Sequence, residues 1–337
     1  MKKTATMLLL TLCACGSTPA GPDDGGPPSD AAPDVTSPQD SGSKDGGPGD
    51  SGADAQSGPT KYDKDGPDSV TTATAMVTNG NSTFTEHLWI PSSIGKHPVV
   101  SLSPGLQQPA AAYAPYGKRL ASWGFVMIAR DDPGFLVQTP AVSADLAFTI
   151  GTWLDARNAD AQSPLFGKVD TARVGLAGHS RGGQATLVAA EGGLKGKVKA
   201  WFGLDPVDSN ASGAQARTNL PQIGIPTTFL GATVSGSCSP MADNYTVLFG
   251  LAPSPAVRID GIGAGHVQFE DPASCVACGL CSPAGSADSA VVLAYSVRYL
   301  TAFFARELQN EASVGAAFQG AGAPADVAAG RVTVTSK

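Results

Sequence analysis

The sequence predicts an α/β fold in which helices flank a mostly parallel central sheet of about eight strands. Short apolar runs alternate with longer helical patterns from about residue 70 onward, as expected when helices connect parallel strands. A glycine-rich turn joins one of these apolar runs to the helical pattern that follows it. The 269 residues after position 68 suit one sizeable domain of this class.

The expected elements follow one another in order along the chain. Each short apolar run is interpreted as a buried strand, and each longer periodic segment as a helix. The last residues, 309–337, are rich in glycine and alanine, and either a final edge strand or a loose tail is expected there. The strands are expected at 72–77, 84–90, 99–103, 125–130, 173–177, 199–204, 227–231 and 257–260, and the helices at 113–122, 143–157, 181–191 and 288–308.

The first residues have the features of an export signal. Two lysines precede an apolar run that is far shorter than the ~20 residues of a membrane-spanning helix. The segment 12–15 (LCAC) is similar to a bacterial lipobox, in which the signal is cut just before a cysteine that then carries lipid. We therefore expect a signal peptide at 1–14 and a lipid at Cys15. This predicts that the chain is exported and is anchored by lipid in the cell envelope, in the outer membrane or on the extracellular side. Ordinary secretory cleavage without a lipid is the alternative.

Residues 15–68 are expected to be a disordered linker before one folded domain at 69–337. Glycine, proline, serine and aspartate dominate this segment, so it cannot bury enough apolar surface to offset its chain entropy. It holds eleven aspartates and three lysines, and the chain's net charge of −7 therefore belongs to it. The remaining chain is nearly neutral, which argues against nucleic acid as a partner.

Four cysteines lie in the expected domain: Cys238, Cys275, Cys278 and Cys281. An even number in an exported chain predicts two disulfide bonds. The last three have the spacing C-x2-C-x2-C, which also occurs in iron–sulfur proteins, so a metal cluster is the competing interpretation. We expect disulfides and no metal. The pairing stays open, although a bond from Cys238 to one of the other three would tie distant loops together.

A G-x-S-x-G motif is formed by Gly178, His179, Ser180, Arg181 and Gly182. It stands between a predicted strand and a predicted helix, which is the context of a nucleophile elbow. The two glycines allow neighbouring backbone to approach closely, and the helix N-terminus favours negative charge that develops near the serine. The motif therefore predicts Ser180 as a nucleophile, and a coincidental glycine-rich turn is the alternative.

A serine hydroxyl needs a general base, and in this type of fold the order along the chain is serine, acid, histidine. His87 and His97 precede Ser180, and His179 is its immediate neighbour. Only His266 follows the serine at a distance, in a glycine-rich segment expected to be a loop after the last strand. We therefore expect His266 to be the base.

The acid that orients this histidine should be a carboxylate at the end of a strand. Asp205 ends a predicted strand 25 residues after Ser180 and is the leading candidate. Asp208 lies close behind it, and Asp243 follows the next predicted strand. Both stay open as alternatives, because a strand-end aspartate is often only a turn cap.

Hydrolysis at a serine also needs two backbone N–H groups that form an oxyanion hole. The residue after the nucleophile, Arg181, is expected to supply one of them. The loop 103–106 after the third predicted strand is expected to supply the other, from Leu106. The side chains of both residues would then line the pocket.

These segments resemble two related families of the α/β-hydrolase fold. Residues 104–105 (PG), 120–125 (LASWGF) and 163–173 (SPLFGKVDTAR) resemble the bacterial cutinases and polyester hydrolases, whereas 178–183 (GHSRGG) and 203–208 (GLDPVD) resemble the chlorophyllases. The resemblance spans about residues 84–308. It implies hydrolysis of carboxylic esters without a cofactor, and it implies Asp205 as the acid, because chlorophyllases place the acid in that motif.

The departures from both families bear on the substrate. Polyester hydrolases typically carry an aromatic residue where Leu106 stands and a methionine where Arg181 stands, and chlorophyllases carry a histidine where Pro104 stands. We therefore expect a serine esterase for small or medium esters that works through an acyl-enzyme. An esterase specialised for chlorophyll-like or polyester substrates is one alternative. A catalytically idle surface lipoprotein that keeps the fold for binding is another.

Overall fold

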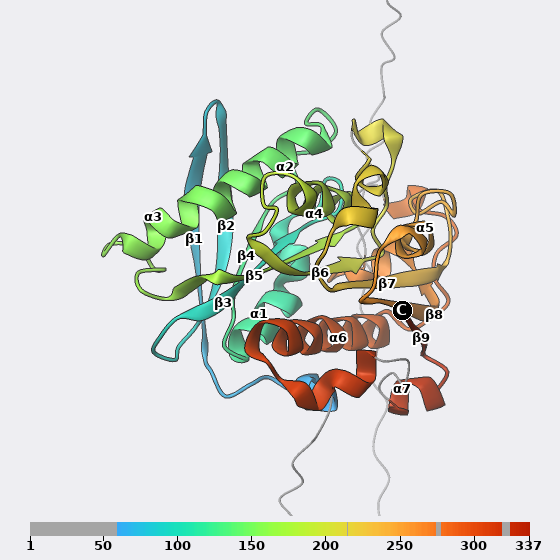
Figure 1. Cartoon of the computed structure of the whole chain (residues 1–337). Coiled ribbons are helices and arrows are strands. Elements are labelled where there is room, and N and C mark those ends of the chain that lie inside the picture. Colours follow the sequence, from blue (N-terminus) through green and yellow to red (C-terminus); the bar gives the residue numbers. More distant parts are fainter. Residues whose placement is uncertain (1–58, 214, 274–277, 319–323) are drawn as a thin grey trace, which may run out of the picture. The chain divides into compact units, whose positions relative to one another are not determined.

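The computed structural model describes residues 59–213, 215–273, 278–318 and 324–337, and its centre is one nine-stranded sheet (Figure 1). The strand order is β1-β2-β4-β3-β5-β6-β7-β8-β9. Strands β4, β3, β5, β6, β7 and β8 run parallel, whereas β1, β2 and β9 are antiparallel to their neighbours. The bounds are β1 Val70–Asn79, β2 Ser82–Pro91, β3 His97–Ser103, β4 Val126–Arg130, β5 Val169–His179, β6 Val198–Leu204, β7 Thr227–Val234, β8 Ala256–Gly265 and β9 Val332–Ser336.

Helices cover both faces of this sheet (Figure 1). Leu120 of α1 and Phe303 of α6 belong to one buried apolar cluster, while Leu146 of α2 and Leu187 of α4 belong to the other. Each cluster is the layer between the sheet and the helices on that side. The helix bounds are α1 Ala114–Ser122, α2 Thr139–Phe148, α3 Leu154–Ala159, α4 Arg181–Glu191, α5 Tyr245–Leu251, α6 Ser289–Gln309 and α7 Pro324–Ala328.

Strand β6 shows how the sheet joins the two layers. Trp201 points into the cluster with α2 and α4, whereas Phe202 and Leu204 point into the cluster with α1 and α6. Alternate residues of a strand face opposite sides of a sheet, and parallel strands are buried on both faces. The parallel strands therefore appear in the sequence as continuous apolar segments. The expected α/β-hydrolase fold with its mostly parallel sheet is confirmed.

The structure corrects two of the expected elements and decides one open alternative. The helix expected at 143–157 consists of three successive elements: α2, a π-helical turn at Thr149–Trp153, and α3. Helix α2 begins earlier than expected, at Thr139, because Pro140 suits a first helical turn. Strand β9 resolves the two alternatives for the chain end, since it pairs with β8 along the sheet edge. Helix α5 was not expected; it is short, and its N-cap is Asn244, whose side chain accepts a hydrogen bond from Thr246 N–H.

The described residues begin at Pro59, inside the segment 15–68 that was expected to be a linker, and residues 59–63 already belong to the fold. Tyr62, the only aromatic residue of that segment, is buried against Trp123 with 4.7 Å between the ring centroids. Asp63 forms an ion pair with Arg298 of α6 at 2.5 Å. One aromatic anchor and several ion pairs, among them Lys61 with Glu311, thus hold a stretch whose composition predicted disorder. Among the described residues, no helix is long and apolar enough to cross a membrane.

A buried carboxyl group lies in the sheet beside an ion pair. Glu86 on β2 is 2% exposed, and Arg130 Nη1 lies 2.8 Å from Asp145 Oδ2 next to it. Burial raises the pKa of Glu86 to about 8; Arg130 opposes this rise, and Asp145 adds to it. Burial, with a contribution from Asp208, also raises the pKa of Glu191 to about 8. Both carboxyl groups therefore keep a proton in the folded protein at pH values where the unfolded chain has lost it.

This difference predicts a stability that falls as pH rises. For each such group the folded state binds more protons than the unfolded state between its ordinary pKa of 4.5 and its raised pKa of about 8. Each contributes a slope of up to about 1.4 kcal/mol per pH unit within that window. Urea unfolding from pH 5 to 8 is expected to show a shallower slope for both E86Q and E191Q than for the wild type. A slope unchanged in E86Q would contradict the assignment.

Candidate active site

The nucleophile elbow is a one-residue turn between β5 and α4. Ser180 has φ 53° and ψ −123°, a conformation that non-glycine residues rarely adopt and that costs about 1–3 kcal/mol. A Cβ on Gly178 would lie 2.3 Å from the carbonyl oxygen of Gly182, and a Cβ on Gly182 would lie 2.1 Å from that of Ser103. Glycine is therefore required at both positions for the turn to fit under the end of β3.

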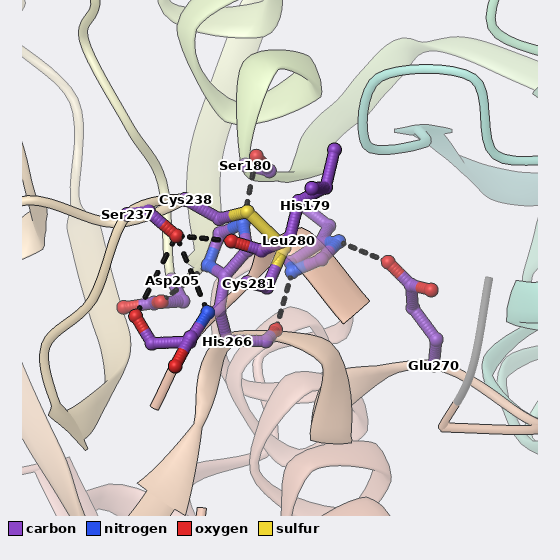
Figure 2. The surroundings of a disulfide bond; sticks show 10 residues. His179, Ser180, Asp205, Ser237, Cys238, His266, Glu270, Leu280 and Cys281 are labelled. Atoms are coloured by element: carbon purple, nitrogen blue, oxygen red, sulfur yellow. Dashed lines mark hydrogen bonds and ion pairs between the residues drawn. A yellow bond between two sulfur atoms is a disulfide. The ribbon is translucent and has the colours of Figure 1, made fainter. Parts of the chain in front are cut away.

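The structure brings Ser180, His266 and Asp205 together in one hydrogen-bonded series (Figure 2). Ser180 Oγ lies 2.9 Å from His266 Nε2, and His266 Nδ1 lies 2.6 Å from Asp205 Oδ2. Because a carboxylate only accepts, Nδ1 donates to Asp205, and Nε2 is left to accept the proton of the serine hydroxyl. Asp205 is fully buried, and its Oδ1 accepts a hydrogen bond from Ala232 N–H.

The sheet explains how three residues so far apart in sequence meet. Ser180, Asp205 and His266 directly follow β5, β6 and β8, whose carboxyl ends lie at the same edge of the sheet. The segment before His266 was expected to be a loop, but residues 261–265 are the end of β8. They stay in the sheet because Gly261 pairs with Ala232 of β7 and with Val332 of β9.

The two alternative acids have partners elsewhere. Asp208 is fully buried, and its Oδ2 lies 2.8 Å from Arg217 Nε. Asp243 Oδ1 lies 2.6 Å from Nη2 of the same arginine. Asp208 also accepts a hydrogen bond from the Gln184 side chain on α4. Their carboxylates thus fix the segment after β6, and only Asp205 of the three candidates contacts His266.

The other histidines are bound outside the series. His87 faces Asp131 at 3.5 Å, and His97 lies between two backbone carbonyls. His179 is 1% exposed and points away from Ser180, as Figure 2 shows. Its Nε2 donates to the backbone carbonyl of His266 at 3.0 Å, and its Nδ1 lies 3.1 Å from Glu270 Oε1. His179 thus holds the backbone of His266 in place through a hydrogen bond to its carbonyl oxygen.

Tyr113 and Glu270 are site residues that sequence reasoning missed. Tyr113 Oη lies 2.7 Å from His179 Nδ1 and 3.4 Å from Glu270 Oε1. Burial is the main cause that raises the pKa of Tyr113 well above its ordinary value, and Glu270 adds to it. No motif marks either residue, because their meeting depends on the packing of segments that are distant in sequence. The one sequence feature that could have indicated a role for Glu270 in the site is its position four residues after His266.

The loop after β3 was expected to contribute to an oxyanion hole. Gly105 N–H donates to Tyr113 Oη at 3.0 Å, Gln107 N–H donates to Asp132 Oδ1 at 2.8 Å, and Gln108 N–H donates to the Gly105 carbonyl at 3.0 Å. Among the residues that the structure describes, the N–H of Leu106 has no acceptor. The N–H of Arg181, at the start of α4, is equally free of a partner within the described chain. Both groups thus lack a protein acceptor within the described chain, as the donors of an oxyanion hole must.

A cleft of about 230 Å³ opens beside Ser180 and His266. The expectation that the Arg181 side chain lines it is wrong. Its guanidinium turns away to Asp132, with Nη2 2.5 Å from Oδ2, because a buried charge needs a partner of opposite sign. Leu106 does line the cleft, as expected. Its other apolar walls are Phe135, Val267, Leu280, Cys238 and Cys281.

A disulfide bond joins Cys238 and Cys281 beside the cleft (Figure 2). It links the loop after β7 to the segment that follows His266, and the Ser237 hydroxyl donates to the Leu280 carbonyl next to it. Cys275 and the side chain of Cys278 lie outside what the structure describes, so a second disulfide stays a prediction. Within the described residues, no group of three or more histidine, cysteine, aspartate or glutamate side chains is placed to hold a metal ion.

Known proteins are similar in sequence to a large part of this chain. A family model described as PET hydrolase-like matches residues 48–275. A bis(hydroxyethyl) terephthalate hydrolase of Streptomyces coelicolor is 28% identical over 195 residues, which cover 57% of this chain and 58% of that protein. Cutinase est1 of Thermobifida alba is 28% identical over 167 residues, covering 50% of this chain and 52% of that protein. Cutinase 2 of Thermobifida cellulosilytica is 30% identical over 145 residues, with coverages of 43% and 50%. The chain thus spans about half the length of the curated relatives it matches.

Proposed function

The chain belongs to the PET hydrolase-like family, and from this premise we propose that it is a serine hydrolase of carboxylic esters. One observation carries the proposal. Ser180, His266 and Asp205 form a hydrogen-bonded series with distances of 2.9 and 2.6 Å at the floor of an apolar cleft. This is the geometry in which a histidine can take the proton of a serine hydroxyl while a carboxylate holds its tautomer.

The reaction proceeds through an acyl-enzyme. Ser180 Oγ attacks the ester carbonyl carbon while its proton passes to His266 Nε2, and the carbonyl electron pair moves onto oxygen. The N–H groups of Leu106 and Arg181 hold that oxyanion. Its collapse breaks the bond to the alcohol, which leaves with the proton from His266. Water then repeats the sequence on the acyl-enzyme, and Asp205 stabilises the imidazolium in both halves.

The cleft favours a small or medium ester. Its volume of about 230 Å³ and its mainly apolar walls suit a short acyl chain or one aromatic ring. One relative is named for bis(hydroxyethyl) terephthalate, which supports an aromatic diester as a second candidate. Phe135 and Leu280, 62% and 74% exposed at the cleft, offer such a substrate apolar contacts. Rates on p-nitrophenyl esters of increasing acyl length and on bis(hydroxyethyl) terephthalate distinguish the two.

The serine is tested by its removal. S180A is expected to lower kcat on short p-nitrophenyl esters by about 10³-fold or more, because the nucleophile is lost while binding is kept. A fluorophosphonate probe should label the wild type and S92A, an exposed serine variant, but not S180A. Unchanged turnover in S180A would refute the mechanism. A wild type that neither turns over esters nor takes the label would favour the idle binding protein instead.

The acid is tested by an isosteric change. D205N is expected to lower kcat by about 10⁴-fold, because an amide in place of the carboxylate favours the wrong tautomer of His266. D208N and D243N are matched controls, since both carboxylates pair with Arg217. Turnover per fluorophosphonate-labelled site should stay near the wild-type value in both. A large loss in either control, with D205N active, would move the role of the acid to that residue.

We also propose that the chain is exported and that Cys15, after a signal peptide at 1–14, anchors the domain to a membrane through lipid. The sequence pattern supports this, and these residues lie outside the described part of the structure. The full-length protein expressed in a bacterial host is expected to enter the detergent phase of a Triton X-114 extract and to incorporate a labelled fatty acid. C15S should do neither, whereas C13S should behave like the wild type. An unlabelled wild type in the aqueous phase would refute the anchor.

A further inference from the structure

The loop Gly105–Gln107 is bound on both sides of Leu106 by buried side chains that also contact the two neighbours of Ser180. We infer that Tyr113 and Asp132 are positioning residues that hold the Leu106 N–H group in place relative to the nucleophile elbow. The inference rests on the proposed function, because it assigns these residues to the oxyanion hole of that reaction. Neither side chain contacts Ser180 or His266, so neither is a catalytic residue.

Tyr113 forms the first connection. Its hydroxyl oxygen accepts the hydrogen bond from Gly105 N–H at 3.0 Å and lies 2.7 Å from Nδ1 of His179, the residue before Ser180. The approach is close enough that a Cβ on Gly105 would lie 2.9 Å from the same nitrogen. Tyr113 is fully buried, and His179 is bound in turn to the carbonyl of His266. One hydroxyl thus joins the loop to the strand that ends at the nucleophile.

Asp132 forms the second connection. Its Oδ1 accepts from Gln107 N–H at 2.8 Å, and its Oδ2 lies 2.5 Å from Nη2 of Arg181, the residue after Ser180. The two charged side chains are 3% and 8% exposed. Gln107 has φ 61°, a left-handed conformation that costs free energy in a residue with a Cβ. The hydrogen bond to Asp132 stabilises the loop in this conformation.

Together the two connections leave one group of the loop unbound. The N–H groups of Gly105 and Gln107 are used, while that of Leu106 between them has no acceptor among the described residues. Their partners, Tyr113 and Asp132, in turn contact His179 and Arg181, the residues before and after Ser180. The loop and the elbow are therefore fixed to each other at two points. Donors held in this way stabilise a developing oxyanion without reorganising during the reaction.

Stability alone is a weak explanation for these groups. A buried ion pair is costly to desolvate and is often no more stable than apolar residues of the same volume. The structure holds a similar pair elsewhere, Arg130 with Asp145, whose side chains are 8% and 7% exposed. It also holds a second buried tyrosine on the same segment, Tyr116, whose hydroxyl donates to the Phe269 carbonyl at 2.9 Å. These residues provide controls of matched chemistry that do not touch the loop.

The experiment compares Y113F with Y116F, and D132N with D145N, in the otherwise unchanged protein. We expect Y113F and D132N to lower kcat on a p-nitrophenyl ester about 10- to 100-fold, with KM within about threefold, because a misplaced donor weakens only the transition state. Rates are expressed per site labelled to completion by a fluorophosphonate. The two controls should stay within about threefold of the wild type in both constants, whatever their thermal stability.

A trifluoromethyl ketone provides a second measurement. Ser180 Oγ bonds to its carbonyl carbon, the carbonyl oxygen becomes an oxyanion in the hole, and the serine proton passes to His266, so that its Ki reports on the same N–H groups. Ki should rise in Y113F and D132N by about the factor that kcat falls. The inference is overturned if kcat per site matches the controls, if only KM or the melting temperature changes, or if Ki does not follow kcat. Should one variant not fold, the other decides; a wild type without ester turnover would overturn the proposed function instead.

Discussion

The conformation of Ser180 is the constraint on which the rest of the site depends. A chain that passes from a central strand into a helix within one residue must place that residue at positive φ and must bring the helix backbone against the end of the neighbouring strand. Gly182 meets this demand because hydrogen is the only substituent that fits beside the Ser103 carbonyl. The strained turn is tolerated because β3, β5 and α4 are packed on all sides, and its result is a hydroxyl raised above the sheet edge.

A parallel sheet then brings the remaining groups to that hydroxyl. All strands from β4 to β8 end at the same edge, so residues that follow different strands meet although 86 positions separate Ser180 from His266. The glycine-rich end of β8 is held from both sides: β9 pairs with β8 up to Gly261, and Val234 of β7 pairs with Gly265, the residue before His266. The disulfide bond from Cys238 to Cys281 ties the segment that follows His266 to the loop after β7. Backbone pairing and the disulfide thus position the segment that carries the imidazole, and Asp205 and Ser180 orient the ring.

The features that sequence could predict are those with a local pattern. The parallel sheet follows from apolar runs, the elbow from two glycines around a serine, and His266 from elimination among four histidines. The resemblance to cutinase-type polyester hydrolases rests on equally local segments, and the family comparison confirms it. Tyr113, Asp132 and Glu270 had no such pattern, since each contacts the site only through tertiary packing. The order of residues 59–63 was missed for the same reason: one buried tyrosine outweighs a composition typical of disorder.

The side chain of Arg181 shows why family resemblance alone does not fix the substrate. The resemblance implies a methionine at this position in polyester hydrolases, where it would face the substrate. A guanidinium in the same place would put an unpaired charge in an apolar cleft, which is strongly unfavourable. Here it turns outward to Asp132 and to the carbonyls of Gly134 and Val137. These bonds hold the segment that carries Phe135, so a charged residue outside the cleft fixes an apolar wall inside it. The shape of the cleft therefore depends on the Arg181–Asp132 ion pair outside it, even though the elbow beneath it follows the motif of the fold.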